Sequence, residues 1–408
     1  MPASLRCSDR GALLLRTAVL FAGLGVLAPG CGNPPKEGTP ASKPPSEATQ
    51  EETTPSAPQA PAGADAGSAT AAEAEAGSAA PSEPAVAADP APQPDPAPQN
   101  GLATLTDEQR ATLISGAQDA PFAVDTHYIQ SNETRHDLYF PYVDGIGGAF
   151  IGVGSDQSFT IAAAAHSELM FMMDIDARVV ELQKMYAVLV PAAESAQALV
   201  EAFHEKNKEA TKATLTEAFS DMGPRELTKL LRGFRVGRET VYRHLMRVVS
   251  RTADGKPVTW LSDPEMFAHI QDLYRKGRVR VMVGNLAGTN SMRTVGQVCK
   301  DLGVPVRVLY MSNAEEYFKY TDDFRANIES LPLDDARSVV LRTIYSKRWV
   351  HADLWAYQVQ PILDFRGRLA DRKNRSRNPM LRLAENAKEL TRKAGPRGLS
   401  LVALELRS

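Results

Sequence analysis

Cysteine is scarce in this chain of 408 residues: there are three, and only Cys299 lies beyond the first 31 positions. A single thiol cannot form an intramolecular disulfide, which excludes a disulfide-stapled fold. Cys299 falls in a helical pattern, and we expect a buried structural thiol there rather than a catalytic one. Long apolar runs are also missing. The apolar stretch at residues 17–28 is shorter than the roughly 20 residues that a transmembrane helix needs.

Residues 32–100 contain no Ile, Leu, Met, Phe, Tyr or Trp, while 15 of these 69 residues are proline. Two lysines stand against ten acidic residues, a net charge of -8. Such a segment cannot bury enough apolar surface to offset the entropy of ordering it. We therefore expect residues 32–100 to be a disordered linker that lets the folded part stand off from an anchor point.

The first 31 residues have the pattern of an export signal. Arg6, Arg10 and Arg16 carry positive charge around the start of the apolar run, and Leu27-Ala28-Pro29-Gly30-Cys31 closes it. A basic start, a short apolar stretch and small residues are typical of a secretory signal peptide. The end of the segment resembles a bacterial lipobox, and this resemblance implies that Cys31 is lipidated and becomes the mature N-terminus. We expect a membrane anchor through Cys31 and a place in the cell envelope, on the outer membrane facing the periplasm or the surface; the alternative is an ordinary signal peptide.

Residues 101–408 alternate between strand and helix patterns, which predicts an α/β domain with a Rossmann-like, mostly parallel sheet. Thr106 and Gln109 have the spacing of a capping box at a first helix. Residues 177–257 are almost wholly helical in pattern and form a long insert between strands. The predicted strands cover residues 148–154, 168–176, 257–263, 278–284, 304–311 and 337–345, with a helix over 353–369 and an edge strand over 399–406.

Glycines follow the first predicted strand, and an acid closes the second. Gly152 and Gly154 would let a ligand approach the backbone, and Asp174 could accept hydrogen bonds from ribose hydroxyls. The segment is not a full Gly-x-Gly-x-x-Gly motif, because position 157 is Gln. The alternative is a glycine turn and an acid that serve structure only. Ligands of such sheets sit beyond the carboxyl ends of the strands, where the candidate binding residues are Gly152, Gly154, Asp156, Asp174, Asp263, Asn285 and Asn313.

The order of elements over residues 145–345 resembles the S-adenosylmethionine-dependent methyltransferase fold. This resemblance implies that the glycine turn meets the amino-acid part of the cofactor, that Asp174 meets the ribose, and that Asp263 lies near the adenine. The acceptor side would then be lined by Asn285, Asn313, Glu315 and Glu316.

A closer resemblance is to an uncharacterised bacterial family with a GVG-x-[DE]-Q-x-F-T turn. The segments that carry it are spread over almost 190 residues, and they imply membership rather than a reaction. They are Ser131-Asn132-Glu133, residues 152–160, Asp174-Ile175-Asp176, residues 284–288 and residues 311–317.

Other chemistries find little support in the residues. His127 and His136 flank the Ser-Asn-Glu segment, but their spacing fits no familiar zinc motif. Ser155 does not stand in a Gly-x-Ser-x-Gly turn, and a P-loop is absent. Nucleic acid is not an expected partner despite two arginine-rich stretches. Those at residues 232–251 could meet anionic lipid or substrate or form a solvated face, and those at residues 366–377 are expected to be an exposed basic surface.

Two functions from different classes remain open. The first is a non-catalytic or ligand-binding domain of the cell envelope, with a small molecule as the ligand. Export favours it, because S-adenosylmethionine is a cytoplasmic metabolite, and so does the missing third glycine. The alternative is a methyltransferase or another group-transfer enzyme with a nucleotide cofactor, in which positioning rather than acid–base chemistry would dominate. No residue is assigned a catalytic role.

Overall fold

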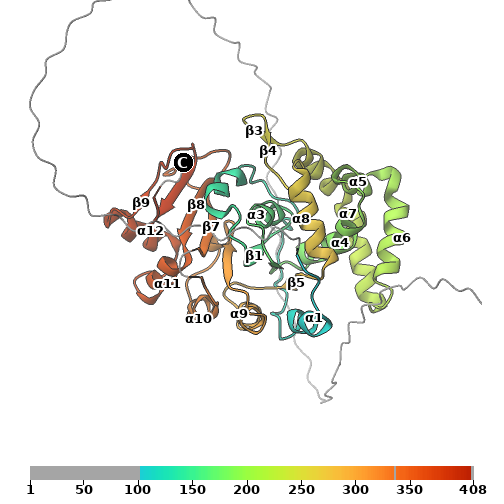
Figure 1. Ribbon diagram of the computed structural model, residues 1–408, viewed down its shortest axis with the longest axis horizontal. Coiled ribbons are helices and arrows are strands. Elements are labelled where there is room, and N and C mark those ends of the chain that lie inside the picture. The colour runs from blue at the N-terminus through green and yellow to red at the C-terminus, as the bar shows by residue number, and fades with distance from the viewer. Residues whose placement is uncertain (1–101, 335–336, 406–408) are drawn as a thin grey trace, which may run out of the picture. The chain divides into compact units, whose positions relative to one another are not determined.

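The computed structural model describes residues 102–334 and 337–405 (Figure 1). The predicted signal peptide with Cys31 and the predicted linker lie outside the described residues. In the described part of the chain, no helix is both long and apolar enough to cross a membrane.

One sheet of eight strands organises the domain, in the order β5-β2-β1-β6-β7-β8-β10-β9. The first five are parallel. Counted along the chain among themselves they stand in the order 3-2-1-4-5, which is the doubly wound Rossmann order with its reversal between β1 and β6. The predicted α/β, Rossmann-like, mostly parallel sheet is therefore confirmed. The strands are β1 (Ala149–Val153), β2 (Leu169–Asp174), β5 (Val279–Val283), β6 (Val306–Tyr310), β7 (Val339–Ile344), β8 (Ala356–Pro361), β9 (Leu390–Thr391) and β10 (Leu399–Val402), with a separate pair β3 (Thr252–Ala253) and β4 (Lys256–Pro257).

Helices cover both faces of the sheet, which explains why the central strands are apolar throughout. Successive side chains point to opposite faces, so that Phe150 joins one core cluster and Ile151 the other. The first cluster includes residues of α2, α3, α4 and α8, and the second includes residues of α1, α9, α10, α11 and α12. The helices are α1 (Asp107–Ile114), α2 (Phe140–Val143), α3 (Gln157–Ala164), α4 (Ala177–Ala192), α5 (Ala196–Ala202), α6 (Lys208–Ala218), α7 (Pro224–Val249), α8 (Pro264–Arg275), α9 (Ser291–Asp301), α10 (Asp322–Ser330), α11 (Ile362–Ala370) and α12 (Arg377–Asn386), with short 3₁₀ turns η1 (His136–Tyr139), η2 (Glu205–Asn207) and η3 (Ala314–Glu316).

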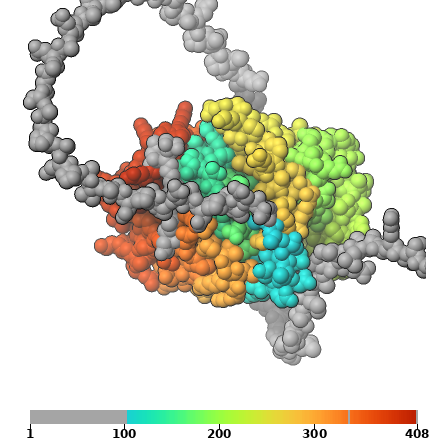
Figure 2. All heavy atoms as spheres, viewed as in Figure 1, coloured from blue at the N-terminus to red at the C-terminus, as the bar shows by residue number. Residues whose placement is uncertain are grey.

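The start of the described chain follows its local sequence closely. Thr106 and Gln109 form the predicted capping box at α1, each side chain accepting from the other's backbone N–H. Figure 2 shows this blue segment lying against the orange part of the chain that contains α9. Thr294 of α9 donates a hydrogen bond to the carbonyl of Ala117, just after α1 (2.7 Å). Cys299 in α9 is fully buried, and burial raises the pKa of its thiol to about 12. An unreactive structural thiol is what such an environment produces.

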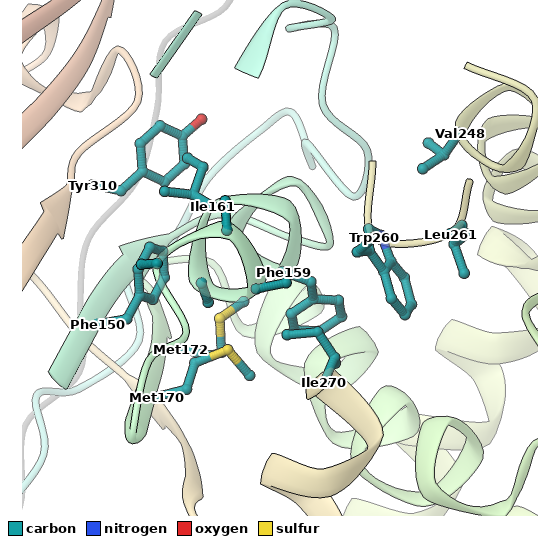
Figure 3. Packing of buried hydrophobic residues seen from close by; sticks show 14 of the residues in the cluster. Phe150, Phe159, Ile161, Met170, Met172, Val248, Trp260, Leu261, Ile270 and Tyr310 are labelled. Atoms are coloured by element: carbon teal, nitrogen blue, oxygen red, sulfur yellow. The ribbon is translucent and has the colours of Figure 1, made fainter. Parts of the chain in front are cut away.

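In the segment predicted as a helical insert, residues 177–249 contain α4 to α7, which gather at the right of Figure 1. Residues 252–257 form the β3–β4 pair instead of a helix. The strand predicted at residues 257–263 is wrong. That segment turns after β4 and buries Trp260, whose ring packs edge-on against Phe159 at 4.8 Å between centroids (Figure 3). A short buried apolar run has the same signature in a strand and in a buried turn. The third parallel strand is β5 instead.

Two further elements differ from the sequence expectation near the C-terminus. Residues 356–361 form β8, not a helix, and pair antiparallel with β7. Buried glutamines disguise this strand: Gln360 accepts a hydrogen bond from Arg342 (2.7 Å), and Gln358 donates to Ser400 (3.2 Å). β10 is not an edge strand, because it lies between β8 and β9. Both differences arise because β8 and β10 pair with strands that are distant in the sequence, which a local pattern does not reveal.

Candidate functional site

Gly154 and Asp174 meet at the carboxyl edge of the sheet, beyond β1 and β2. Gly154 has φ +91°, a conformation that favours glycine. Its N–H donates to Asp174 Oδ2 (3.1 Å), and Asp174 Oδ1 accepts from the Asp176 N–H (2.8 Å). Burial raises the pKa of Asp174 to about 6. Both carboxylate oxygens of Asp174 thus already accept hydrogen bonds from backbone N–H groups of the same chain.

The Gln157 side chain closes the glycine turn. Its Oε1 accepts from the Ser155 N–H (3.0 Å), and its Nε2 occupies the space where a Cβ on Gly154 would lie. Gln183 of α4 donates to the Gly154 carbonyl. The N–H groups of Gly154 and Ser155 are therefore engaged within the protein. In this arrangement neither of these two groups is free to bind S-adenosylmethionine or another nucleotide cofactor.

Asp156 is buried and holds the helical insert to the sheet. His244 of α7 lies with Nε2 at 2.9 and 3.1 Å from the two carboxylate oxygens, and Trp260 Nε1 is at 3.5 Å. Burial alone would raise the pKa of Asp156, but the charge and hydrogen bond of His244 outweigh it, and the pKa lies below its usual value. Both side chains are at most 3% exposed. This geometry makes Asp156 a structural anchor.

Two other candidate residues have structural roles. Gly152 lies inside β1, where a Cβ would collide with the Phe150 ring and with Ser158. Asp263 does not end a strand: it is the N-cap of α8, and its Oδ1 accepts from the N–H groups of Glu265 (2.8 Å) and Met266 (3.1 Å). The predicted place of Asp263 after a third strand is thus wrong, for the reason given for residues 257–263.

Asn285 follows β5 and is half-buried in a turn. Its Oδ1 accepts from the Ala287 N–H (2.9 Å), and its own N–H donates to Asp119 (3.1 Å). The Asp119 carboxylate also accepts from the N–H groups of Asn290 (3.0 Å) and Ser291 (3.3 Å). Asp119 therefore organises the turn before α9. The sequence analysis missed this residue, because an aspartate in a loop far from the turn in sequence carries no local signal.

Glu133 is the centre of a buried polar cluster at the carboxyl ends of β6 and β7. It accepts hydrogen bonds from Tyr310 and Ser312, and from Thr343 Oγ1 at 2.8 Å. His136 Nε2 lies 3.0 Å from its Oε2. Burial alone would raise the pKa of Glu133, but the hydrogen bonds and the charge of His136 outweigh it, and the net direction is downward. The cluster joins Glu133 of the Ser-Asn-Glu segment to Ser312 of the residue 311–317 segment.

The neighbours of Glu133 fix the same segment to the β7–β8 hairpin. Trp355 Nε1 donates to Asn132 Oδ1 (3.0 Å), and Thr134 Oγ1 donates to Asp353 (2.6 Å). Tyr357 also donates to Asp353 (2.8 Å). Residues 132–134 are thus held by side-chain contacts to the segment that leads into β8, far away in the chain. Among residues 102–334 and 337–405, no three His, Cys, Asp or Glu side chains are grouped to hold a metal ion.

A polar hollow of about 310 Å³ opens beyond the ends of β6 and β7. Asn313 begins η3 and donates weakly to Tyr317 (3.4 Å). Glu316 pairs with Arg377 of α12 (2.9 Å), whose side chain is only 7% exposed, so the expected exposure of Arg377 is wrong. The hollow is lined by Glu315, Glu316, Phe318, Lys319, Tyr345, Ser346, Ser376, Arg377 and Asn378.

His127 and Asp176 form a partner pair that the sequence analysis missed. His127 Nδ1 lies 2.8 Å from Asp176 Oδ2, with the imidazole 47% exposed and the carboxylate 8% exposed. Asp176 also caps α4 by accepting from the Arg178 N–H. A local signal existed only for Asp176, which stands at an N-cap position. The two residues are 49 positions apart in the sequence, so no local pattern indicated the pair.

Comparison with known proteins places most of the described domain in one family. Residues 128–403 match a family described as a domain of unknown function (DUF7790). No curated protein matches the chain. Among solved structures, the rRNA methyltransferase aviRa from Streptomyces viridochromogenes is similar at 11% identity, with a TM-score of 0.23, over 55% of this chain and 84% of that one.

Proposed function

This chain belongs to the DUF7790 family, and we propose that it is an exported, lipid-anchored protein whose domain acts without catalysis, as a ligand-binding domain of the cell envelope. One observation carries the proposal. The backbone groups of the glycine turn, which a cofactor would use, are bonded to Asp174, Gln157 and Gln183 of the same chain.

The polar groups elsewhere along this edge are also occupied. Asp156 is paired with His244, and Glu133 receives four polar neighbours. Both carboxylates are buried and hydrogen-bonded within the chain, which supports a structural role for each. The proposed ligand is a small molecule, and the hollow beyond β6 and β7 offers it polar groups at the edge where ligands of parallel sheets bind.

One specific observation favours the alternative function, a group-transfer enzyme with a nucleotide cofactor. Asp174 ends β2 beside the glycine turn, is only partly buried, and stands where an acid meets ribose in nucleotide-binding sheets. The side chain that lies over Gly154 is Gln157, which has rotatable bonds. If Gln157 swings away, a group-transfer enzyme with S-adenosylmethionine becomes the better description.

Calorimetric titration of residues 32–408 with S-adenosylmethionine and S-adenosylhomocysteine separates the two functions. We expect no binding heat up to millimolar ligand, because the turn's N–H groups already have acceptors. Gln157→Ala is the matched variant, since it uncovers Gly154 and frees the Ser155 N–H; binding that appears only in this variant would show that Gln157 alone closes the turn to a cofactor. Micromolar binding by the parent that is lost in Asp174→Ala would instead establish the enzyme alternative.

The proposed anchor has its own test. In a bacterial host grown with a labelled fatty acid, we expect the full chain to take up label and to sediment with membranes. Cys31→Ser should abolish both, because the thiol is the proposed site of acylation. Cys7→Ser is the matched control and should leave labelling intact. Labelling that survives Cys31→Ser would contradict the lipid anchor.

A further inference from the structure

α7 presents two unlike faces along its 26 residues. Leu230, Phe234, Val241, Leu245 and Val248 are at most 2% exposed and pack into the core. The opposite face follows steps of three or four residues, the spacing that keeps side chains on one side of a helix. Its members are all exposed: Arg225, Lys229, Arg232, Val236, Glu239, Arg243 and Arg247.

This face, the cationic stripe, carries five positive side chains and one negative one. The acid, Glu239, is paired with Arg243 (3.3 Å). Among the described residues, no acid lies within ion-pair distance of Arg225, Lys229 or Arg232. Along the helix axis the stripe extends roughly 33 Å, at 1.5 Å per residue. Its charge is thus both concentrated and largely uncompensated.

Exposed apolar side chains lie on or beside the stripe. Val236 is 72% exposed within it, and Met246 is 39% exposed next to Arg247. A basic helical face with a few exposed apolar side chains is the pattern that lies on anionic bilayers, where each Lys or Arg near the surface contributes favourably. The same charges contribute little to the fold, because exposed ion pairs are weak.

We propose that the cationic stripe of α7 docks the domain on a bilayer that contains anionic phospholipid. The inference rests on the proposed membrane anchor, since a lipid at Cys31 would keep the domain near such a surface. The stripe supplies the charge complementarity: positive side chains face phosphate headgroups, and Val236 and Met246 face the boundary of the acyl region. The linker's net charge of -8 opposes this attraction, so the test must keep residues 32–100 in place.

Vesicle flotation with unlipidated residues 32–408 tests the docking apart from the anchor. We expect at least tenfold stronger binding to vesicles of equal parts phosphatidylglycerol and phosphatidylcholine than to pure phosphatidylcholine at 50 mM salt. The triple variant Arg225→Glu, Lys229→Glu and Arg232→Glu should lose at least tenfold. The matched control reverses three exposed cations elsewhere, Arg372→Glu, Lys373→Glu and Arg375→Glu, and should keep at least half of the binding.

Three results would overturn the docking. They are equal binding to both vesicle types, no binding to either, or equal loss in the control variant, which would reduce the effect to net charge. Circular dichroism shows whether each of the two triple variants is folded. We expect both to fold, because all six substituted side chains are exposed. None of these outcomes bears on labelling at Cys31, so a failed dock and a failed anchor are distinguishable.

Discussion

Glu133→Ala should lower the free energy of unfolding by about 3–5 kcal/mol, the range for breaking a buried charged pair. The carboxylate is 2% exposed, and its removal leaves His136, Tyr310, Ser312 and Thr343 without their shared acceptor. Buried donors that lose a partner incur their full desolvation cost. Urea denaturation of residues 32–408, followed by circular dichroism at pH 7, measures the change.

The variant Glu133→Gln and the pH dependence of stability give two further checks on the role of Glu133. Glu133→Gln keeps one acceptor oxygen and should lose less than Glu133→Ala. The pKa of Glu133 is lowered in the folded protein, so its contribution to stability is present above the unfolded pKa and is lost as the pH falls through the folded value. The difference in the free energy of unfolding between the parent and Glu133→Ala should therefore become smaller at acidic pH. A gap below about 1 kcal/mol at pH 7 would contradict a central role for the cluster.

His244→Ala should also cost about 3–5 kcal/mol, because it leaves the buried carboxylate of Asp156 without its pairing partner. Asp156 is 1% exposed, and the side-chain contact that it would retain from Trp260 is long (3.5 Å). The pair joins α3 to α7, so the insert should loosen first. Hydrogen exchange in α7 and urea denaturation of the whole chain report the two effects.

Arg243→Ala is the matched control, one position earlier on the same helix but on its exposed face. An exposed substitution of this kind should stay within about 0.5 kcal/mol of the parent. The pKa of Asp156 is lowered, so the pair stabilises above the unfolded pKa of the carboxyl and is lost in acid. Equal effects of His244→Ala and Arg243→Ala would show that Asp156 and His244 are not a structural anchor.

Elements with a local cause were predictable from the sequence. The capping box at Thr106, the parallel strands that hold Gly152 and Asp174, and the burial of Cys299 all follow from spacing and hydrophobic pattern over a few residues. The failures have a common cause as well. Trp260 makes its turn resemble a strand, and the glutamines of β8 hide a strand, because in each case burial is decided by partners elsewhere in the chain.

The candidate site likewise has some features that the sequence predicts and others that depend on tertiary contacts. That Gly154 and Asp174 would meet was readable, since adjacent parallel strands end at one edge of the sheet. That Gln157 would cover the turn was not, because a glutamine at that position has several rotamers open to it. The link from Glu133 to Ser312 spans 179 residues and joins two segments that were recognised separately.

By itself, the sequence determined the α/β class, the helical insert and the strand ends where polar residues gather, because each depends on periodicity and neighbours along the chain. Only the tertiary structure decided that these polar residues bond to one another, that Asp156 and Glu133 are buried anchors, and that one face of α7 is left cationic and exposed. The physical reason is that hydrogen-bond partners and burial belong to pairs of segments, and the packing of the whole chain chooses those pairs.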